Sequence, residues 1–198
     1  SVAGAHVYAD DGSYTVEICV TDDELAETCN QLVATVQNVS PTVDAGEDGS
    51  ADEGSVFELA PSTFNDQGTL DTHTATVDWG DATAVEDAVV TEAPFGPPGS
   101  TAGADGSAAA EHVYADNGTY TVTVCLTDDD DAETCDALVL TVLNVAPTVD
   151  AGADQTTPEA VSIWLGPSTF NDKGTADTHA ARIDWGDGSA IATGLVTE

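Results

Sequence analysis

The chain has 198 residues, of which 37 are acidic and only 2 are basic, so its formal net charge at pH 7 is −35. Because so few cationic side chains are available, nucleic-acid phosphates and anionic membrane surfaces are excluded as partners, and cations are expected instead. Hydrophobic residues make up 41% of the chain. That share is too high for a disordered acidic tail, while every apolar run is far shorter than the roughly 18–20 residues of a membrane span. The composition predicts a soluble, folded protein.

The first predicted element is a β-hairpin within residues 6–38. Every second residue from 14 to 20 is apolar, which predicts a strand with one buried face. This alternation places Cys19 on the outer face, and Cys29 lies opposite it on the returning strand if the turn is centred near Glu24. Directly opposed residues of antiparallel strands have Cα atoms about 4.5–5.5 Å apart, which is within the range of a disulfide.

A second cysteine pair, Cys125 and Cys135, repeats the spacing of Cys19 and Cys29. We therefore predict the disulfides Cys19–Cys29 and Cys125–Cys135, and with them an oxidising, extracellular location. The alternatives are four free thiols or a metal pair. Zinc is disfavoured, because this spacing is not that of a zinc knuckle and no His lies nearby in the sequence.

The region after the hairpin begins with a turn-rich linker that contains a proline, residues 38–46, which indicates a domain boundary. About seven short strands separated by Asp, Gly and Asn turns follow, which predicts an all-β, immunoglobulin-like β-sandwich. We expect a first extended region that includes Val56, Leu59 and Phe64, and then strands at residues 72–79, 84–91, 111–114, 119–127 and 133–143. The Gly/Pro/Ala-rich residues 93–106 are expected to form a loop.

The sequence also repeats itself. Residues 6–38 return as residues 112–144, and a shift of about 106 positions leaves about 54 of roughly 92 aligned residues identical. The linkers at residues 38–46 and 144–152 set the phase of the repeat. We therefore predict the C-terminal half of one domain at residues 1–39, a complete domain at 40–145, and the N-terminal half of another at 146–198. The halves belong either to one continuous array within a longer protein or to neighbouring chains that complete each other.

Two motifs carry a resemblance to a known family. Residues 78–81 read DWGD and return as DWGDG at residues 184–188, and residues 112–120, HVYADNGTY, precede the strand TVTVCLTD. In this order the motifs resemble the polycystic-kidney-disease (PKD) domain family, although Ala82 stands where a second glycine is expected. The resemblance implies tandem β-sandwiches of extracellular proteins, such as surface layers, adhesins, filaments and spacers beside secreted hydrolases.

Acidic residues gather in turns. In such a sandwich, the loop at residues 65–71, the hairpin tip at residues 128–131, and Asp44 and Asp48 after the linker should meet at one end. Clustered carboxylates repel one another unless a cation neutralises them, and oxygen-only donors suit Ca²⁺. The predicted calcium ligands are Asn65, Asp66, Asp71, Asp128 and Asp129, with the copies Asn171, Asp172 and Asp177. The alternative is a set of solvated acidic turns that favour solubility or a high-salt habitat.

No residue pattern indicates catalysis. The four histidines are two recurring pairs, His6/His112 and His73/His179, and neither a nucleophile elbow nor a zinc-protease motif is present. Asp71 beside His73 invites interpretation as a catalytic dyad, but its recurrence favours a structural, hydrogen-bonded histidine. We expect no enzyme activity.

The tryptophans and two sequons complete the candidate sites. Trp79 and Trp185 fall on the apolar positions of a strand and are expected in the core, whereas Trp164 is the better candidate for an exposed aromatic. Asn38 and Asn117 lie in sequons and are candidate glycosylation sites, although neither sequon is repeated.

The sequence thus predicts a structural tandem-repeat module of an extracellular filament, stalk or cell-surface layer, rigidified by calcium and hairpin disulfides, whose partners are copies of itself. The alternative is an adhesin or carbohydrate-binding spacer attached to a secreted enzyme. In that case Trp164 and the loop at residues 93–106 would contact glycans.

Overall fold

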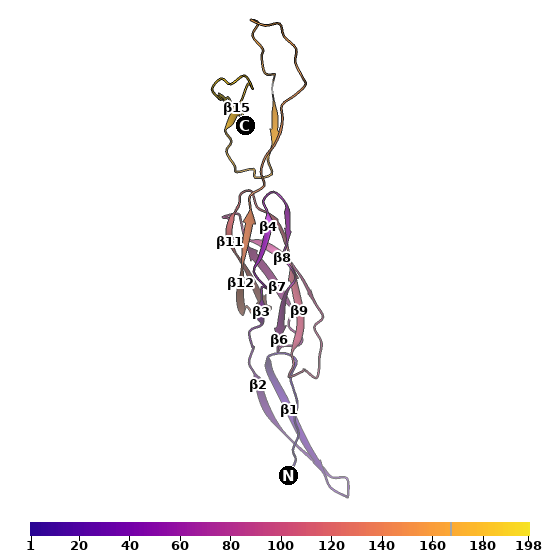
Figure 1. The fold of residues 1–198 in the computed structure, drawn as a ribbon. Helices are drawn as coiled ribbons and strands as arrows, with labels where there is room; N and C mark the ends of the chain where they lie inside the picture. Colours follow the sequence, from indigo (N-terminus) through magenta and orange to yellow (C-terminus); the bar gives the residue numbers. More distant parts are fainter. Residues whose placement is uncertain (167) are drawn as a thin grey trace. The chain divides into compact units, whose positions relative to one another are not determined.

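The computed structural model describes residues 1–166 and 168–198 (Figure 1). Every helix or strand assigned in these residues is a β-strand, and none of them forms a helix that could cross a membrane. The all-β fold class is therefore confirmed. The strands are β1 Gly12–Thr21, β2 Glu27–Val36, β3 Thr42–Asp44, β4 Gly49–Asp52, β5 Val56–Glu58, β6 Ser62–Asp66, β7 His73–Asp78, β8 Glu86–Glu92, β9 Ala104–Ala109, β10 Glu111–Val113, β11 Gly118–Asp128, β12 Glu133–Leu143, β13 Thr148–Asp150, β14 Thr169–Asn171, β15 Ala181–Ile183 and β16 Ala192–Gly194.

Contacts between Cα atoms divide the chain into two compact units. The first unit comprises Ser1–Gly49, Phe57–His112 and Thr119–Leu140, and the second comprises Ser50–Val56, Val113–Gly118 and Thr141–Glu198. The boundaries predicted from the repeat remain predictions.

The N-terminal hairpin has the predicted register. β1 and β2 pair antiparallel with Cys19 opposite Cys29, and the two residues form a disulfide with Cα atoms 4.0 Å apart. Cys125 and Cys135 are joined in the same way across β11 and β12, with Cα atoms 4.1 Å apart. Both predicted disulfides are confirmed, so the alternatives of free thiols and of a metal pair are wrong.

The central sheet follows the strand order β3-β6-β9-β8-β7-β11-β12-β4 (Figure 1). β8 divides it into two layers, because Glu86–Ala88 pair with β7 whereas Val89–Glu92 pair with β9. Because β8 changes partners in this way, the hydrogen-bonded strands form two facing layers, which is a β-sandwich.

The core of the first unit fills the space between these layers. Phe64 of β6 and Ala108 of β9 pack with Ala75 of β7 and Leu126 of β11. All four are at most 6% exposed. Alternation along β11 and β12 buries every second residue from Val122 to Asp128 and from Leu138 to Val142, as the period-2 pattern predicts.

β9 is among the strands that were not predicted from the sequence, as are β3 and β4. β9 begins within residues 93–106, which were predicted to form a loop because of their Gly, Pro and Ala content, and it ends at Ala109. It pairs with both β6 and β8. Small residues are needed there, because a side chain at Gly106 would enter the ring of Phe64. Low β-propensity was therefore outweighed by close packing.

The turn after Trp79 has an alanine, Ala82, in place of the second glycine of its motif. Ala82 adopts a left-handed backbone with φ of 68°, and its counterpart Gly188 has φ of 82°. The left-handed conformation is ordinary for glycine but costs an alanine free energy.

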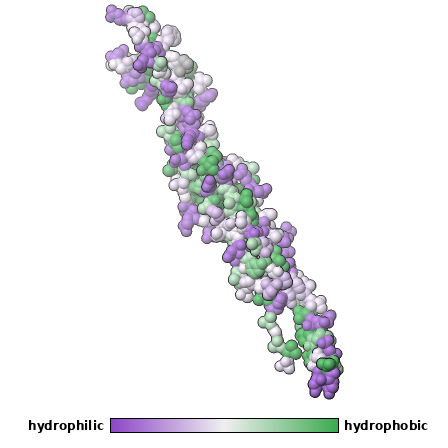
Figure 2. Space-filling model, turned by 90° about the vertical axis from the view of Figure 1, so that its right-hand side faces the viewer, coloured by the Kyte–Doolittle hydropathy of each residue, from purple (hydrophilic) through white to green (hydrophobic). Residues whose placement is uncertain are grey.

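Equivalent positions of the two repeats differ in how far their side chains are buried. Ile18 and Val20 of β1 are 41% and 56% exposed, whereas their counterparts Val124 and Leu126 are fully buried. Residues 1–39 contain no counterparts of β6 and β9, which cover this face in the central sheet. Figure 2 accordingly shows hydrophobic patches among hydrophilic ones on the viewed face.

The second unit repeats part of the pattern. β13 pairs with β14 through Val149 and Phe170, as β3 pairs with β6 through Val43 and Phe64. Trp185, however, is 45% exposed whereas Trp79 is 1% exposed, so the predicted burial holds for Trp79 only. The His112 ring that covers Trp79 has no counterpart within residues 146–198.

Candidate functional site

Three buried carboxylates meet where β6 and β11 end. Asp66, Asp71 and Asp128 each offer an oxygen, and these oxygens lie within 4.8 Å of one another. The three residues are 1%, 4% and 4% exposed. The sequence brings them together because the B–C-type loop and the F–G-type hairpin of a sandwich share one end.

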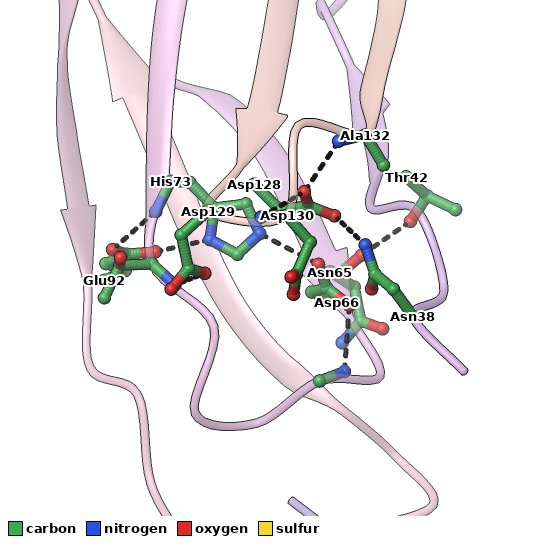
Figure 3. A network of polar contacts seen from close by, with 12 residues as sticks. Asn38, Thr42, Asn65, Asp66, His73, Glu92, Asp128, Asp129, Asp130 and Ala132 are labelled. Carbon is green, nitrogen blue, oxygen red and sulfur yellow. Dashed lines mark hydrogen bonds and ion pairs between the residues drawn. The ribbon is translucent and has the colours of Figure 1, made fainter. Parts of the chain in front are cut away.

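Turn hydrogen bonds fix two of these carboxylates. Asp66 Oδ1 accepts from the backbone N–H of Gly68 at 2.9 Å, and Asp128 Oδ1 accepts from the N–H groups of Asp130 and Ala132 at 3.0 and 2.8 Å. Side chains of Asp and Asn commonly close turns in this way. The second oxygen of Asp128 accepts from the Asn38 amide at 2.8 Å (Figure 3).

Asp71 differs from its two neighbours. Its Oδ1 is buried and has no hydrogen-bond partner among the described residues. Burial, followed by the negative charges of Asp66 and Asp10, raises the pKa of Asp71 from its usual 3.8 to about 7. A carboxylate with an unpaired buried oxygen beside other carboxylates is energetically costly, so the group is suited to bind a cation or a proton.

His73 is enclosed by carboxylates on both sides of its ring. Nε2 lies 2.9 Å from Asp66 Oδ2 and Nδ1 lies 2.7 Å from Glu92 Oε2 (Figure 3). Burial alone would lower the pKa of His73, but the hydrogen bonds to Asp66 and Glu92 outweigh it and raise that pKa. Asp71 makes neither of these bonds, so the Asp71–His73 dyad is not formed, and both ring nitrogens of His73 are engaged.

The same arrangement occurs about 106 residues later. His179 Nε2 lies 2.8 Å from Asp172 Oδ2, and Nδ1 lies 2.8 Å from Glu198 Oε1. Hydrogen bonds to Asp172 and then Glu198 raise the pKa of His179. The predicted structural role of the paired histidines agrees with these contacts.

The other predicted ligands are placed differently. Asn65 donates to Ala102 O and to Asp105 Oδ1, away from the acid group. Asp129 Oδ1 accepts from the N–H of Thr72 at 2.9 Å. Asn171 pairs with Thr148 in the ladder of β13 and β14. Of the predicted copies, Asp172 binds His179, while Asp177 lies with Glu53 and Asp116.

The predicted meeting with Asp44 and Asp48 does not occur. Asp44 closes a turn by accepting from the N–H of Gly46, and Asp48 accepts from the N–H of Val139 on β12. The linker instead contributes Asn38 to the acid group. β3 begins at Thr42 opposite Asn65 and runs away from this end, which carries Asp44 off with it.

Sequence reasoning missed Glu92 and Glu53. Glu92 holds His73, and a signal was available because Glu92 recurs as Glu198. Glu53 also recurs, as Glu159, but the sequence around neither glutamate indicates that Glu53 is buried.

The two sequon asparagines have different surroundings. The Asn38 side-chain amide that would carry a glycan donates to Asp128 Oδ2 at 2.8 Å. Asn117 is exposed.

Residues 38–142, just over half of the chain, match the family model described as PKD domain. The chain belongs to the PKD domain family. A similar solved structure is the PKD domain of an M14-like peptidase from Thermoplasmatales archaeon SCGC AB-540-F20, with 22% identity over 54% of this chain and 98% of that chain and a TM-score of 0.35. The comparison with curated proteins found no match. PKD domains are non-catalytic modules that are typically extracellular, and the two disulfides fit an oxidising environment.

Proposed function

We propose that this PKD chain is a structural repeat module of an extracellular filament, stalk or cell-surface layer, in which copies follow one another along the chain. One observation carries the proposal. The N–H of Leu70 donates to Ala9 O at 2.9 Å, and the N–H of Ala176 donates to Ala115 O at 3.0 Å. The two bonds are equivalent under the repeat, and each crosses a predicted domain boundary, which supports repeats that are joined in the same way.

Disulfides support this role. The bridges Cys19–Cys29 and Cys125–Cys135 each close the long hairpin that ends a predicted domain. A cross-link between paired strands resists opening of the hairpin, which is useful in a protein that carries load.

Calcium is proposed as the ion that stiffens this end of the domain. Asp66, Asp71 and Asp128 offer only oxygen ligands, which suits calcium, and Asp71 Oδ1 is a buried acceptor without a partner among the described residues. Asp71 would be a direct ligand, and Asp66 and Asp128 would share the ion while keeping their turn hydrogen bonds.

Electron microscopy of the protein and of any particles that it assembles into tests the structural role. We expect extended particles with an axial repeat of one or two domains when calcium is present, and shorter or bent particles in a chelator. Isolated compact particles in both conditions would contradict the proposal.

The adhesin or carbohydrate-binding alternative rests on Trp164, which is 83% exposed. An exposed indole can stack on a sugar ring. Binding on a glycan array that is lost in Trp164→Ala would favour this function, whereas an array without signal would disfavour it.

A further inference from the structure

A second group of carboxylates lies within the unit formed by Ser50–Val56, Val113–Gly118 and Thr141–Glu198. Glu53, Asp116 and Asp177 each offer an oxygen, and these oxygens lie within 4.8 Å of one another. Glu53 follows β4, Asp116 follows β10, and Asp177 lies between β14 and β15. Three chain segments that are distant in sequence therefore converge on one point.

Hydrogen bonds hold Glu53 in place, but only one of its two carboxylate oxygens has a hydrogen-bond partner among the described residues. Its exposure is 0%. Its backbone N–H donates to Leu143 O at 3.0 Å, and its Oε1 accepts from the N–H of Val145 at 2.6 Å. Its Oε2 is buried and has no hydrogen-bond partner among the described residues.

The carboxylate of Glu53 faces Asp177 across Gly174. A methyl group at Gly174 would lie 2.7 Å from Asp177 Oδ2 and 2.8 Å from Glu53 Cδ. The absence of a side chain at this position lets the two carboxylates approach each other. Such an approach between like charges is unfavourable unless a positive charge lies between them.

No cationic side chain in the described part of the chain supplies that charge. The chain has only two basic residues, Lys173 and Arg182. Lys173 is the closer of the two to Asp177 in sequence, and its Nζ donates to Ser55 Oγ at 3.5 Å. No ion pair of the described residues joins Lys173 or Arg182 to Glu53 or to Asp177. The ring of His179 is committed to Asp172 and Glu198.

We propose that Glu53, Asp116 and Asp177 bind one divalent cation of the calcium type, at a site separate from Asp66, Asp71 and Asp128. The donors are all oxygens, and a cation would give the buried Oε2 of Glu53 its missing partner. By the predicted boundaries, Glu53 and Asp116 belong to residues 40–145 and Asp177 to residues 146–198. The cation would therefore link consecutive repeats, which extends the proposed structural function but does not depend on a cation at Asp66.

Counting bound calcium on the full 198-residue chain tests the inference. Equilibrium dialysis should find one fewer calcium ion per chain in Glu53→Gln and in Asp177→Asn than in the wild type. Glu58→Gln is the matched control, because Glu58 is an exposed glutamate of the neighbouring strand β5, and it should bind the wild-type number. Unchanged stoichiometry and affinity in both Glu53→Gln and Asp177→Asn would overturn the inference.

Thermal melting separates a cation ligand from a residue that only supports the fold. In chelator, Glu53→Gln should melt at or above the wild-type temperature, because the substitution relieves repulsion and glutamine can still accept from Val145. In calcium, the wild type should gain more than the variant. Equal destabilisation of the variant in both conditions would overturn the inference.

Asp128→Asn separates this site from the one in the proposed function. If Asp128→Asn loses an ion and Glu53→Gln does not, only the present inference fails. If Glu53→Gln loses an ion and Asp128→Asn does not, the inference stands and calcium at the Asp66 group fails.

Discussion

His112 stacks on Trp79, with ring centroids 4.9 Å apart and 12° between the ring planes. The same imidazole places Nε2 2.8 Å from Asp81 Oδ2 in the turn that follows Trp79. Two motifs that are distant in sequence, DWGD and HVY, are thus joined by one side chain.

Replacement of His112 by alanine should destabilise the first unit. The loss of a ring contact and of a charged hydrogen bond should lower the free energy of unfolding by about 1–3 kcal/mol. Urea denaturation followed by tryptophan fluorescence measures the effect. His6→Ala is the control, because His6 occupies the same motif but is exposed, and it should change stability by less than about 0.5 kcal/mol. Equal effects of the two substitutions would contradict the importance of the stack.

The metal-free protein should be more stable at pH 5 than at pH 8. The pKa of Asp71 is raised to about 7, so the native state binds a proton that the unfolded chain has released, and this stability is lost as the pH rises from about 4 to 7. His73 acts in the same direction, because its pKa is also raised and its contribution is lost as the pH rises through that value.

Melting in chelator across this pH range measures the effect, which we expect to be a few degrees. Asp71→Asn should make the profile shallower, because it removes the titration of Asp71 and leaves that of His73. Saturating calcium should weaken the advantage of low pH, since protons compete with the ion. A wild-type profile that Asp71→Asn leaves unchanged would refute this prediction.

Loss of the Cys125–Cys135 disulfide should lower the free energy of unfolding by about 2–3 kcal/mol, as expected for closure of a short loop. The double substitution to serine, compared with the oxidised wild type in guanidinium, provides the measurement. The control is the corresponding Cys19/Cys29 double substitution. It should leave the unfolding of the central sheet unchanged, because this bridge lies in the separate sheet of β1 and β2.

Gly174→Ala should weaken cation binding in the second unit without any change of charge. The added methyl group would displace Asp177 and Glu53 from their present approach. We expect a loss of calcium affinity of about tenfold, or roughly 1.4 kcal/mol, measured by titration calorimetry. Gly166→Ala is the control, because no described atom lies within 4 Å of a methyl group at that position. Full affinity in Gly174→Ala would mean that the two carboxylates need not approach each other.

The sequence predicted those parts of the fold in which alternation is regular. β12 has the predicted bounds, and Cys19 lies opposite Cys29 because a register shift by one residue would turn every side chain to the other face. β9 could not be predicted, since its alanines and glycine have low β-propensity and are selected by contact with Phe64.

The candidate sites were only partly predictable. Asp66, Asp71 and Asp128 were grouped correctly because the loops of a sandwich share an end. Glu53 was not found, because its burial depends on Leu143 and Val145, which lie 90 or more residues away in the sequence. Asn65 was misplaced because one residue separates the two faces of β6, and its side chain is directed to Asp105 rather than to the acid group.

The strand order of the central sheet ends at β3 on one side and at β4 on the other, and these strands have three and four residues. Short edges offer few unpaired backbone groups to another sheet. Together with a net charge of −35, they oppose lateral stacking of one molecule on another. In the proposed filament or stalk, such edges would let the chain lengthen domain by domain while neighbouring molecules remain separate.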